Sequence, residues 1–490
     1  MSAPPLVTRH PTRLVPDASR VIAQLFVPGH YRPDPDETRA SGVVAHVLAL
    51  DEDDVAATLA SVVHRFGGRH RDLDETFRHH ADRIGNRLQP DTTLSDARWA
   101  LLGATFTHEY AVEAAALCNP SAVPAPDQSG VPSGALRFVM SVRQIGEGHR
   151  SSIGFRTGIL DDGALTIDAP ARFTSAGKVG GGDLRADTFR TLAKGSRVDS
   201  DATLWVLDRL DPRFTIGELE GRLVELEDQK DTRRDVAATA RRMRQLAARS
   251  YATRFAVGSD LSERVLYPAT SVESNGMEDA RFIRFVDDDG TVTYHATYTA
   301  FDGSGIVQQL LTTVDFLDFT SSPLLGAAAV NKGLALFPRR IDGRFAALSR
   351  HDGVTNSVSF SDDIQRWPTS VPITCPITPW EVIQVGNCGP PIETEAGWLV
   401  LTHGVGPMRT YSIGAWLLDR DDPTKLIGRL HQPLLTPQAD EQDGYVPNVV
   451  YSCGAVLHGD RLLIPYGIGD AAIGFATAQV DKVLAAMHVA

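Results

Sequence analysis

Apolar residues recur at two different spacings along the chain, helical near its beginning and strand-like afterwards. The acidic run 51–54 precedes apolar residues at helical intervals over 55–63, the arrangement of a capped amphipathic helix. Further helices are predicted through 73–84 and from 95 toward 110. We therefore expect residues 1–110 to form a mainly helical N-terminal region.

From about Arg137 the apolar residues fall in short runs separated by turn residues. These runs are rich in β-branched and aromatic residues, and the clearest cover 137–143, 291–298, 398–402 and 461–466. Asp-Asp-Asp-Gly at 287–290 is typical of a hairpin loop, and one helical insertion is expected at about 216–255. No repeat of about 40 residues is evident, so the spacing leaves an array of sandwiches and a propeller both open. The bulk of the chain is predicted to be all-β.

Composition narrows the classes of protein that this chain could represent. Its 490 residues predict one large domain or two ordinary ones, and 42% hydrophobic with 22% charged residues is typical of globular proteins. A net charge of −13 argues against a nucleic-acid partner. We expect no membrane segment, because no apolar run approaches the roughly 18 to 20 residues of a membrane helix. With four scattered cysteines and no secretory signal pattern, the chain is predicted to be cytoplasmic.

One short acidic motif is a candidate for chemistry. Glu278-Asp279-Ala280-Arg281 follows the turn-forming pair Asn275-Gly276 and precedes a predicted strand, so we expect its carboxylates on a loop at a strand end. Arg281 could pair with either carboxylate and hold it in place. Taken alone, the motif is also compatible with a purely structural ion pair.

A second segment runs against the overall charge of the protein. Five cations lie between residues 332 and 350 with only Asp342 opposing them, namely Lys332, Arg339, Arg340, Arg344 and Arg350. Such a concentration in an acidic chain predicts an anionic ligand, phosphate being the commonest. The alternative is an exposed basic strand pair without a ligand. A metal is not expected, because the histidines of the helical region lack a complete ligand set.

Several of these motifs together resemble glycoside hydrolase family 130, the family of β-mannoside phosphorylases and β-1,2-mannosidases. They occur in family order between about residue 115 and the C-terminus, and they are Asn275–Arg281, Ala296–Ala300, Leu336–Arg339 with Ser349-Arg350, Ser361–Asp363 with Trp367, Gly389–Pro391 with Gly397–Leu399, and Tyr466-Gly467 with Asp470. Each motif is modest by itself, whereas the ordered set is specific. The first hundred residues lie outside the resemblance.

The resemblance implies a fold and an assignment of site residues. It implies a five-bladed β-propeller catalytic domain over 111–490, with Asp279 as the catalytic acid that protonates the glycosidic oxygen through the mannosyl 3-hydroxyl. The positions that match phosphate contacts are Lys332, Arg350 and His403. Those that match or adjoin sugar contacts are Asn119, Ser121, Arg143, Glu278, Arg281 and Asp470.

The implied reaction is inverting phosphorolysis of a β-1,2- or β-1,4-linked mannoside, giving α-mannose 1-phosphate. A phosphorolytic site needs one acid and a cationic clamp, whereas water as the nucleophile needs a base. Inorganic phosphate is then the co-substrate, with no further cofactor and no metal.

Two alternatives and one structural question remain open at this point. Glu393 and Glu395 lie after Gly389–Pro391, where the family often has a lysine, and the first interpretation is that they are surface acids. They could also repel phosphate, or one of them could serve as the base of an inverting β-1,2-mannosidase. A noncatalytic carbohydrate-binding propeller is the third reading. The N-terminal helices could mediate a homo-oligomer or cover a neighbouring subunit's site.

Overall fold

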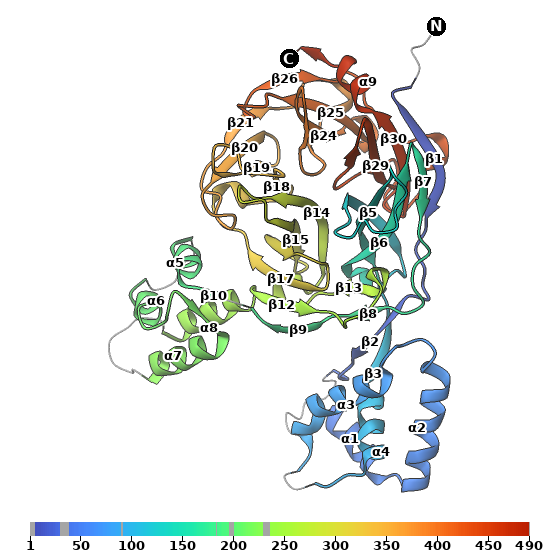
Figure 1. Ribbon diagram of the computed structural model, residues 1–490. Coiled ribbons are helices and arrows are strands. Elements are labelled where there is room, and N and C mark those ends of the chain that lie inside the picture. Colours follow the sequence, from blue (N-terminus) through green and yellow to red (C-terminus); the bar gives the residue numbers. More distant parts are fainter. Residues whose placement is uncertain are drawn as a thin grey trace.

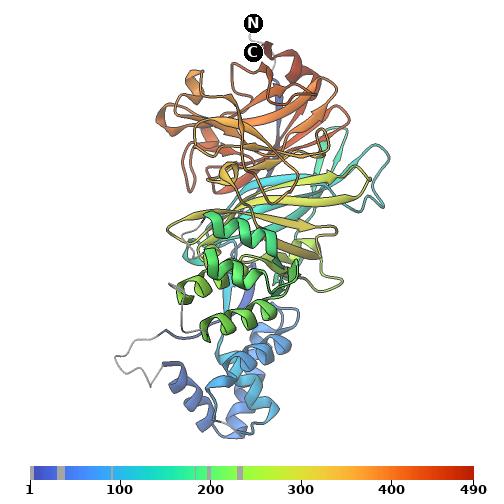
Figure 2. The same ribbon diagram turned by 90° about the vertical axis from the view of Figure 1, so that its left-hand side faces the viewer.

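The computed structural model describes residues 5–29, 39–89, 92–182, 184–195, 200–228 and 236–489, and strands are its main element. Figure 1 shows the sheets in the upper part of the molecule, with two helical regions below them. In the turned view of Figure 2 the N-terminal helices again lie below the sheets, while the helical insertion lies in front of the lower strands. The expectation of a mostly β chain with helical additions is therefore confirmed.

The N-terminal helical region consists of helices whose starts are visible in the sequence. They are α1 (Arg39–Ala49), α2 (Glu52–Phe66), α3 (Leu73–Ile84) and α4 (Asp96–Thr105). Asp51 caps α2 by accepting a hydrogen bond from the Asp54 N–H, and Ser95 caps α4 in the same way. Helix α4 ends before Tyr110, because Thr107–Ala111 forms strand β3, which pairs with β2 (Val21–Leu25).

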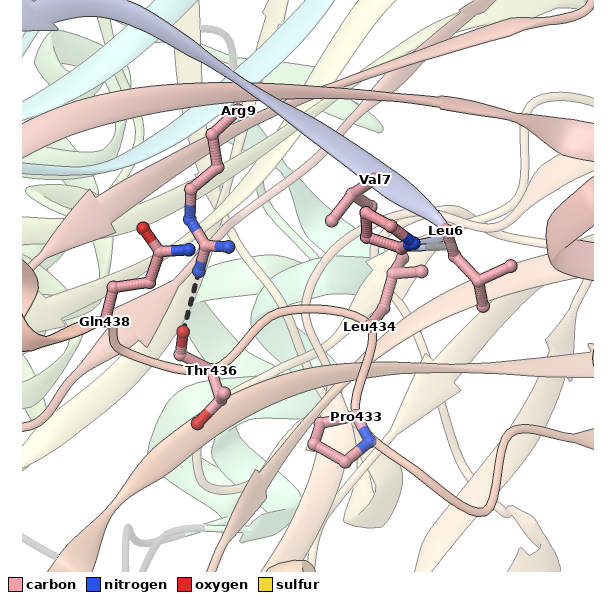
Figure 3. Close-up of a pocket in the computed structure, with 8 residues that line it drawn as sticks. Leu6, Val7, Arg9, Pro433, Leu434, Thr436 and Gln438 are labelled. Atoms are coloured by element: carbon pink, nitrogen blue, oxygen red, sulfur yellow. Dashed lines mark hydrogen bonds between the residues drawn. The ribbon is translucent and has the colours of Figure 1, made fainter. Parts of the chain in front are cut away.

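The beginning of the chain belongs to a sheet rather than to this helical region. Strand β1 (Val7–Leu14) pairs antiparallel with β30 (Ala472–Gln479), so an early and a late strand of the chain lie side by side. Figure 3 shows the pocket beside β1, where Arg9 Nη2 donates to the Thr436 carbonyl at 2.7 Å. The predicted boundary at residue 110 thus does not separate helices cleanly from strands.

Two successive groups of strands share one twelve-stranded sheet. The first group contains β4 (Ala116–Pro124), β5 (Leu136–Ile145), β6 (Ser151–Asp161) and β7 (Ala164–Ile167). The second contains β14 (Gly276–Val286), β15 (Val292–Phe301), β16 (Ile306–Thr313), β17 (Asp318–Pro323), β12 (Tyr251–Arg254) and β9 (Lys178–Gly181). The groups meet where Gly276 pairs with Ser151. The short strand β13 (Arg264–Leu266) pairs with β6 of the first group and with β8 (Ser175–Ala176).

The remaining strands form separate sheets that follow in chain order. The third group is β18 (Ala335–Leu336), β19 (Phe345–Ser349), β20 (Asn356–Ser361) and β21 (Val371–Thr374). The fourth is β22 (Gln384–Asn387), β23 (Ile392–Thr394), β24 (Gly397–Val405), β25 (Tyr411–Leu418), β26 (Leu426–Arg429) and β31 (His488–Val489). The fifth is β27 (Val450–Tyr451), β28 (Val456–His458), β29 (Arg461–Ile468), β30 and β1. All four apolar runs predicted as strands lie in strands β5, β15, β24 and β29.

The helical insertion is longer than expected and begins earlier. It contains α5 (Ala186–Gly195), α6 (Ser200–Leu207), α7 (Ile216–Asp228) and α8 (Val236–Ala247), with β10 (Leu184–Arg185) and β11 (Arg213–Phe214) beside them. Leu219, Leu223 and Leu226 are buried in a core that these helices share among themselves. The predicted end at 255 is wrong, because Tyr251–Arg254 pairs as β12 with β17.

Buried glutamates repeat at corresponding places in four of the strand groups. Glu113, Glu273 and Glu381 each stand three residues before the first strand of a group, while Glu441 precedes β27. Glu273, Glu381 and Glu441 also close capping boxes of short 3-10 turns. Tyrosine or arginine side chains bind all four carboxylates. These positions are an internal repeat that the spacing of apolar residues did not reveal.

Candidate active site

Asp279 lies inside strand β14, not on a loop as its turn-forming neighbours suggested. The register with β15 shifts between Glu278 and Arg281, and Asp279 has a φ of 55°. A β-bulge of this kind re-aims a side chain out of the regular alternation of a strand. The prediction of a loop position was therefore wrong, because the Asn275-Gly276 turn precedes β14 while the carboxylates belong to the strand itself.

A second bulge on β4 faces the first. Its register with β5 shifts between Cys118 and Ser121, and Asn119 at this shift has a φ of 48°. Asn119 Nδ2 donates to Asp279 Oδ1 at 2.5 Å. The first strands of the first two strand groups thus present an amide and a carboxylate to each other.

Cations surround Glu278 and Asp279, the two neighbouring acidic residues on β14. Arg143 Nη2 lies 2.6 Å from Glu278 Oε1, and its Nη1 lies 3.5 Å from Asp279 Oδ1. Lys332 Nζ lies 3.1 Å from Glu278 Oε2. Glu278 is therefore neutralised by two cations, and it holds both of them beside Asp279.

Arg281 supports Asp279 from within the core. Only 2% of Arg281 is exposed, and its Nη1 donates to the Asp279 carbonyl at 2.8 Å. Its Nη2 donates to Tyr451 Oη and its Nε to the Cys388 carbonyl, both at 2.9 Å. The bonds to Cys388 and Tyr451 connect β14 to the fourth and fifth strand groups. Arg281 is thus placed to hold the backbone of the site, with its own donors already engaged.

The two central aspartates have opposite electrostatic environments. Burial raises the pKa of Asp279, but the charges of Arg143 and Arg281, with Lys332 and the Asn119 hydrogen bond, outweigh it and hold that pKa below 3.8. Burial raises the pKa of Asp470 to about 6, with Arg143 opposing this shift and Asp279 adding to it. At neutral pH the free protein holds an ionised carboxylate at 279, whereas Asp470 titrates near pH 6.

Arg350 and His403 form the second half of the site. Arg350 is 8% exposed, and its Nη1 lies 3.3 Å from His403 Nε2 while its Nη2 donates to the Gly353 carbonyl. Gln384 Nε2 lies 3.2 Å from the same His403 nitrogen. Burial, together with the charge of Arg350, lowers the pKa of His403 well below 6.5, so this imidazole is neutral.

A buried arginine normally has a carboxylate partner, and Arg350 has none within the described ranges. Its Nε is buried without a hydrogen-bond partner there, as is Asn387 Oδ1. Gly386 permits the close approach, since a Cβ at this position would lie 2.5 Å from Arg350 Nε. The arrangement leaves positive charge available for an anion.

The two halves are joined by one aromatic side chain. Tyr451 accepts a hydrogen bond from Arg281, and its ring centroid lies 4.9 Å from that of His403. Tyr451, Gln384 and Asn387 were missed in the sequence. Asn387 could have been found, because it stands two residues before Gly389–Pro391, whereas nothing in the sequence distinguishes Tyr451 or Gln384.

Not every predicted site residue lies open to a ligand. Ser121 is completely buried, and its hydroxyl accepts a hydrogen bond from the Phe282 N–H. It therefore fastens β4 to β14. Asn119, Arg143, Glu278, Asp279 and Asp470 gather in one cluster, which Lys332 joins through Glu278.

The basic segment is only partly a cationic clamp. Arg339 pairs with Glu393 at 2.7 Å, and Arg340 pairs with Asp287 at 2.6 Å. Arg344 lies over the ring of Phe360. Three of the five cations thus have structural partners elsewhere, and the inference from their number alone was too broad.

Glu393 and Glu395, which depart from the family pattern, have different surroundings in the structure. Glu393 is bound by Arg339 and lies 3.2 Å from Arg420, while Glu395 is exposed in the following turn. Arg339 and Arg420 lower the pKa of Glu393 through hydrogen bonds. Glu393 therefore forms a peripheral ion-pair group.

Among the residues that the structure describes, no group of three or more His, Cys, Asp or Glu side chains could hold a metal ion. A search of the same residues found no helix with the length and apolarity needed to cross a membrane. Cys118, Cys388 and Cys453 are buried free thiols, whereas Cys375 is exposed.

Comparisons with known proteins agree with the motifs. The sequence model of glycoside hydrolase family 130, described as beta-1,4-mannooligosaccharide phosphorylase, matches residues 257–489. A 1,2-beta-oligomannan phosphorylase of Thermoanaerobacter sp. (strain X514) is 35% identical over 231 residues, which are 46% of this chain and 75% of the relative. A beta-1,2-mannobiose phosphorylase of Listeria innocua serovar 6a is 33% identical over 238 residues, 46% of this chain and 63% of the relative.

A solved structure of beta-1,2-mannobiose phosphorylase from Listeria innocua, in complex with beta-1,2-mannobiose, is also similar. It is 22% identical with a TM-score of 0.44, and the match covers 76% of this chain and 92% of that one. The sequence relationship to the Thermoanaerobacter phosphorylase covers most of that enzyme and decides the classification: this chain belongs to glycoside hydrolase family 130.

Proposed function

We propose that this chain is a β-mannoside phosphorylase. It cleaves a β-1,2- or β-1,4-linked manno-oligosaccharide with inorganic phosphate and inversion, and it releases α-mannose 1-phosphate. The named relatives are phosphorylases of these linkages, which supports the assignment. No other cofactor enters the proposed reaction.

The proposed scaffold is a five-bladed β-propeller over residues 111–490, with β1 added to its last blade. Five successive strand groups and the pairing of β1 with β30 support this architecture. The repetition of buried glutamates before the first strands of four groups also supports it, at Glu113, Glu273, Glu381 and Glu441. The helices of 39–105 and the helical insertion then lie outside the catalytic core. A homo-oligomer built through the N-terminal helices stays a prediction.

The observation that carries the proposal is the buried, uncompensated charge of Arg350. Burial of a guanidinium without a carboxylate is costly unless a ligand supplies the negative charge. Phosphate supplies this charge together with several acceptor oxygens, and Arg350 with neutral His403 offers N–H groups to bind it. Lys332 adds a second, more exposed cation, with 43% of its side chain accessible.

Asp279 acts as the general acid in this proposal. The phosphate oxygen attacks the anomeric carbon on one face of the ring, and the glycosidic oxygen leaves from the other. The proton reaches the leaving oxygen from Asp279 through the mannosyl 3-hydroxyl. Because phosphate brings negative charge toward Arg350, its binding raises the pKa of Asp279 and favours the protonated acid.

The contacts of Glu393 favour phosphorolysis over hydrolysis. A hydrolase needs a base that activates water, and Glu393 is held by Arg339 and Arg420 instead. Asn119, Arg143 and Asp470 are left to bind the mannosyl hydroxyls. Arg281 and Ser121 then act by holding the strands that carry these residues.

The test is turnover of β-1,2- and β-1,4-mannobiose with and without inorganic phosphate. We expect α-mannose 1-phosphate and free mannose in equal amounts, with turnover that depends on phosphate. Equal release of mannose in both conditions would identify a hydrolase. Binding of mannobiose without turnover under either condition would identify a carbohydrate-binding module.

A further inference from the structure

An exposed aromatic pair connects the turn after β5 to the loop before β27. Tyr445 Oη lies 2.9 Å from His149 Nδ1, and the two ring centroids are 5.8 Å apart. Both side chains are exposed, Tyr445 to 48%. They come from loops 296 positions apart in the sequence, so their contact is a product of the tertiary fold.

Backbone connections place this pair beside the site. His149 lies in the turn that follows β5, the strand that carries Arg143. The Val446 N–H donates to the Gly469 carbonyl at 2.8 Å, so the backbone next to Tyr445 is joined to the backbone next to Asp470. Arg143 and Asp279 are near enough to Asp470 to shift its pKa. The aromatic pair thus borders the group that we assign to the mannosyl residue.

Two hydrogen bonds hold the loop that carries His149 in place. Tyr110 Oη donates to the Glu147 carbonyl at 2.9 Å, and Arg150 Nη1 donates to Tyr267 Oη at 2.6 Å. His149 itself has a φ of 61°. Because the protein's own groups make these contacts, the exposed pair is preorganised, and a ligand would not have to order it.

The aromatic pair and the anion site come from different strand groups. Arg350 and His403 belong to the third and fourth strand groups, whereas His149 and Tyr445 belong to loops of the first and fifth. Asn119 and Asp279, which we assign to the mannosyl residue, are buried, whereas the aromatic pair is exposed. The pair is therefore placed for the next sugar outward, which is the leaving sugar.

We propose that His149 and Tyr445 form a stacking platform for the acceptor sugar, the residue released when the β-mannoside is cleaved. This inference rests on the proposed function and names the residues that recognise its second product. Aromatic rings bind the apolar face of a pyranose, and a tyrosine hydroxyl or an imidazole nitrogen can also bond to sugar hydroxyls. The platform determines which acceptor is used, while Asp279 and the anion site carry out the transfer.

The synthetic direction tests this platform directly. With α-mannose 1-phosphate as donor and mannose as acceptor, Tyr445→Ala should raise the KM for the acceptor about tenfold, as expected for a lost stacking contact. The KM for α-mannose 1-phosphate, and that for phosphate in phosphorolysis, should stay unchanged. Tyr445→Phe keeps the ring and should restore the acceptor KM, and His149→Ala should resemble Tyr445→Ala.

The matched control is another exposed aromatic pair. Phe26 is 50% exposed, and its ring lies 5.5 Å from that of His108 near the helical region. Phe26→Ala should leave all three KM values unchanged. The platform is refuted if Tyr445→Ala leaves the acceptor KM unchanged, or if it raises the KM for donor and phosphate equally.

A failure of the proposed function can be told apart from a failure of the platform. If the wild-type protein shows no phosphate-dependent turnover, calorimetric binding of β-1,2- and β-1,4-mannobiose to wild-type protein and Tyr445→Ala replaces the kinetic test. Weaker binding by the variant would support the platform even though the proposed phosphorylase reaction is wrong. Equal binding, or no binding by either protein, overturns the platform.

Discussion

Asn119 donates a 2.5 Å hydrogen bond to Asp279 although 160 positions separate the two residues. Both have a positive φ and both lie at bulges of first strands, so each leaves the regular alternation of its strand. Residues held in this region of φ cost about 1 to 3 kcal/mol each and are concentrated at functional sites. The pair therefore defines the centre of the candidate site.

Asp279→Asn should abolish the acid without disturbing the fold. The amide keeps the shape of the carboxyl group but cannot donate the proton to the leaving oxygen, so kcat should fall about 10²- to 10⁴-fold. Asp288→Asn in the exposed β14–β15 loop is the matched control and should retain activity. Circular dichroism and kcat of both variants provide the measurement, and retained turnover by Asp279→Asn would remove this residue from the mechanism.

Asn119→Ala should weaken catalysis less than loss of Asp279 itself. A hydrogen bond to a charged group contributes about 1.5 to 3 kcal/mol, which corresponds to roughly a 10- to 100-fold decrease in kcat/KM. Because this bond favours ionised Asp279, its loss should also raise the pKa of Asp279. The pH profile of kcat/KM should move toward higher pH, and a decrease without this movement would indicate loss of sugar binding alone.

Arg350→Ala should affect phosphate more than sugar. Removal of the buried guanidinium should raise the KM for phosphate roughly 10- to 100-fold, as expected for charge-assisted hydrogen bonds. Arg344→Ala changes a cation of the same segment that lies over Phe360, and it should leave that KM unchanged. Initial rates over a matrix of phosphate and mannobiose concentrations separate the two constants. Equal increases in both would place Arg350 outside the anion site.

Glu393→Gln should separate phosphorylase from hydrolase. In the proposed phosphorylase, Glu393 only pairs with Arg339 and Arg420, and a partly exposed pair contributes less than about 1 kcal/mol to stability. Turnover should therefore remain close to that of the wild-type protein. A large loss of mannose release, with unchanged melting temperature, would instead assign Glu393 as the base of a hydrolase.

Asp470→Asn should change the pH dependence of stability. Burial raises the pKa of Asp470 from 3.8 to about 6, so its contribution to stability is complete below about pH 4 and is lost as the pH rises through 6. The loss amounts to roughly 2 to 3 kcal/mol at neutral pH. The variant should therefore melt at a higher temperature than the wild-type protein at pH 7.5, with a smaller difference at pH 4.5. Equal melting curves at both values would contradict this effect of burial.

Local features of the chain were predicted well from the sequence alone. The acidic residues before α2, the strands β5, β15, β24 and β29 and the 287–290 hairpin all follow from spacing and turn residues. The ordered motifs also suggested Asp279 and Arg350 as site residues, and their roles stay predictions. Each of these features depends on neighbouring residues, because capping, alternation and turn formation act over a few positions.

Residue pairings across long stretches of chain were decided only by the tertiary structure. The sequence showed five cations in one segment. In the fold, Arg339 pairs with Glu393 and Arg340 pairs with Asp287, whereas Arg350 lies beside His403. A charge count cannot predict such partners, because they are brought together by strand pairing and by packing between sheets.

The acid motif shows the same division. The order of its residues identified Asp279 as a candidate acid, whereas the two bulges and the approach of β4 to β14 determined where its carboxylate points and which groups set its pKa. The sequence by itself thus determined which residue types are available and in what order. The tertiary structure decided which of them share a low-dielectric site, where burial and nearby charge give them their chemistry.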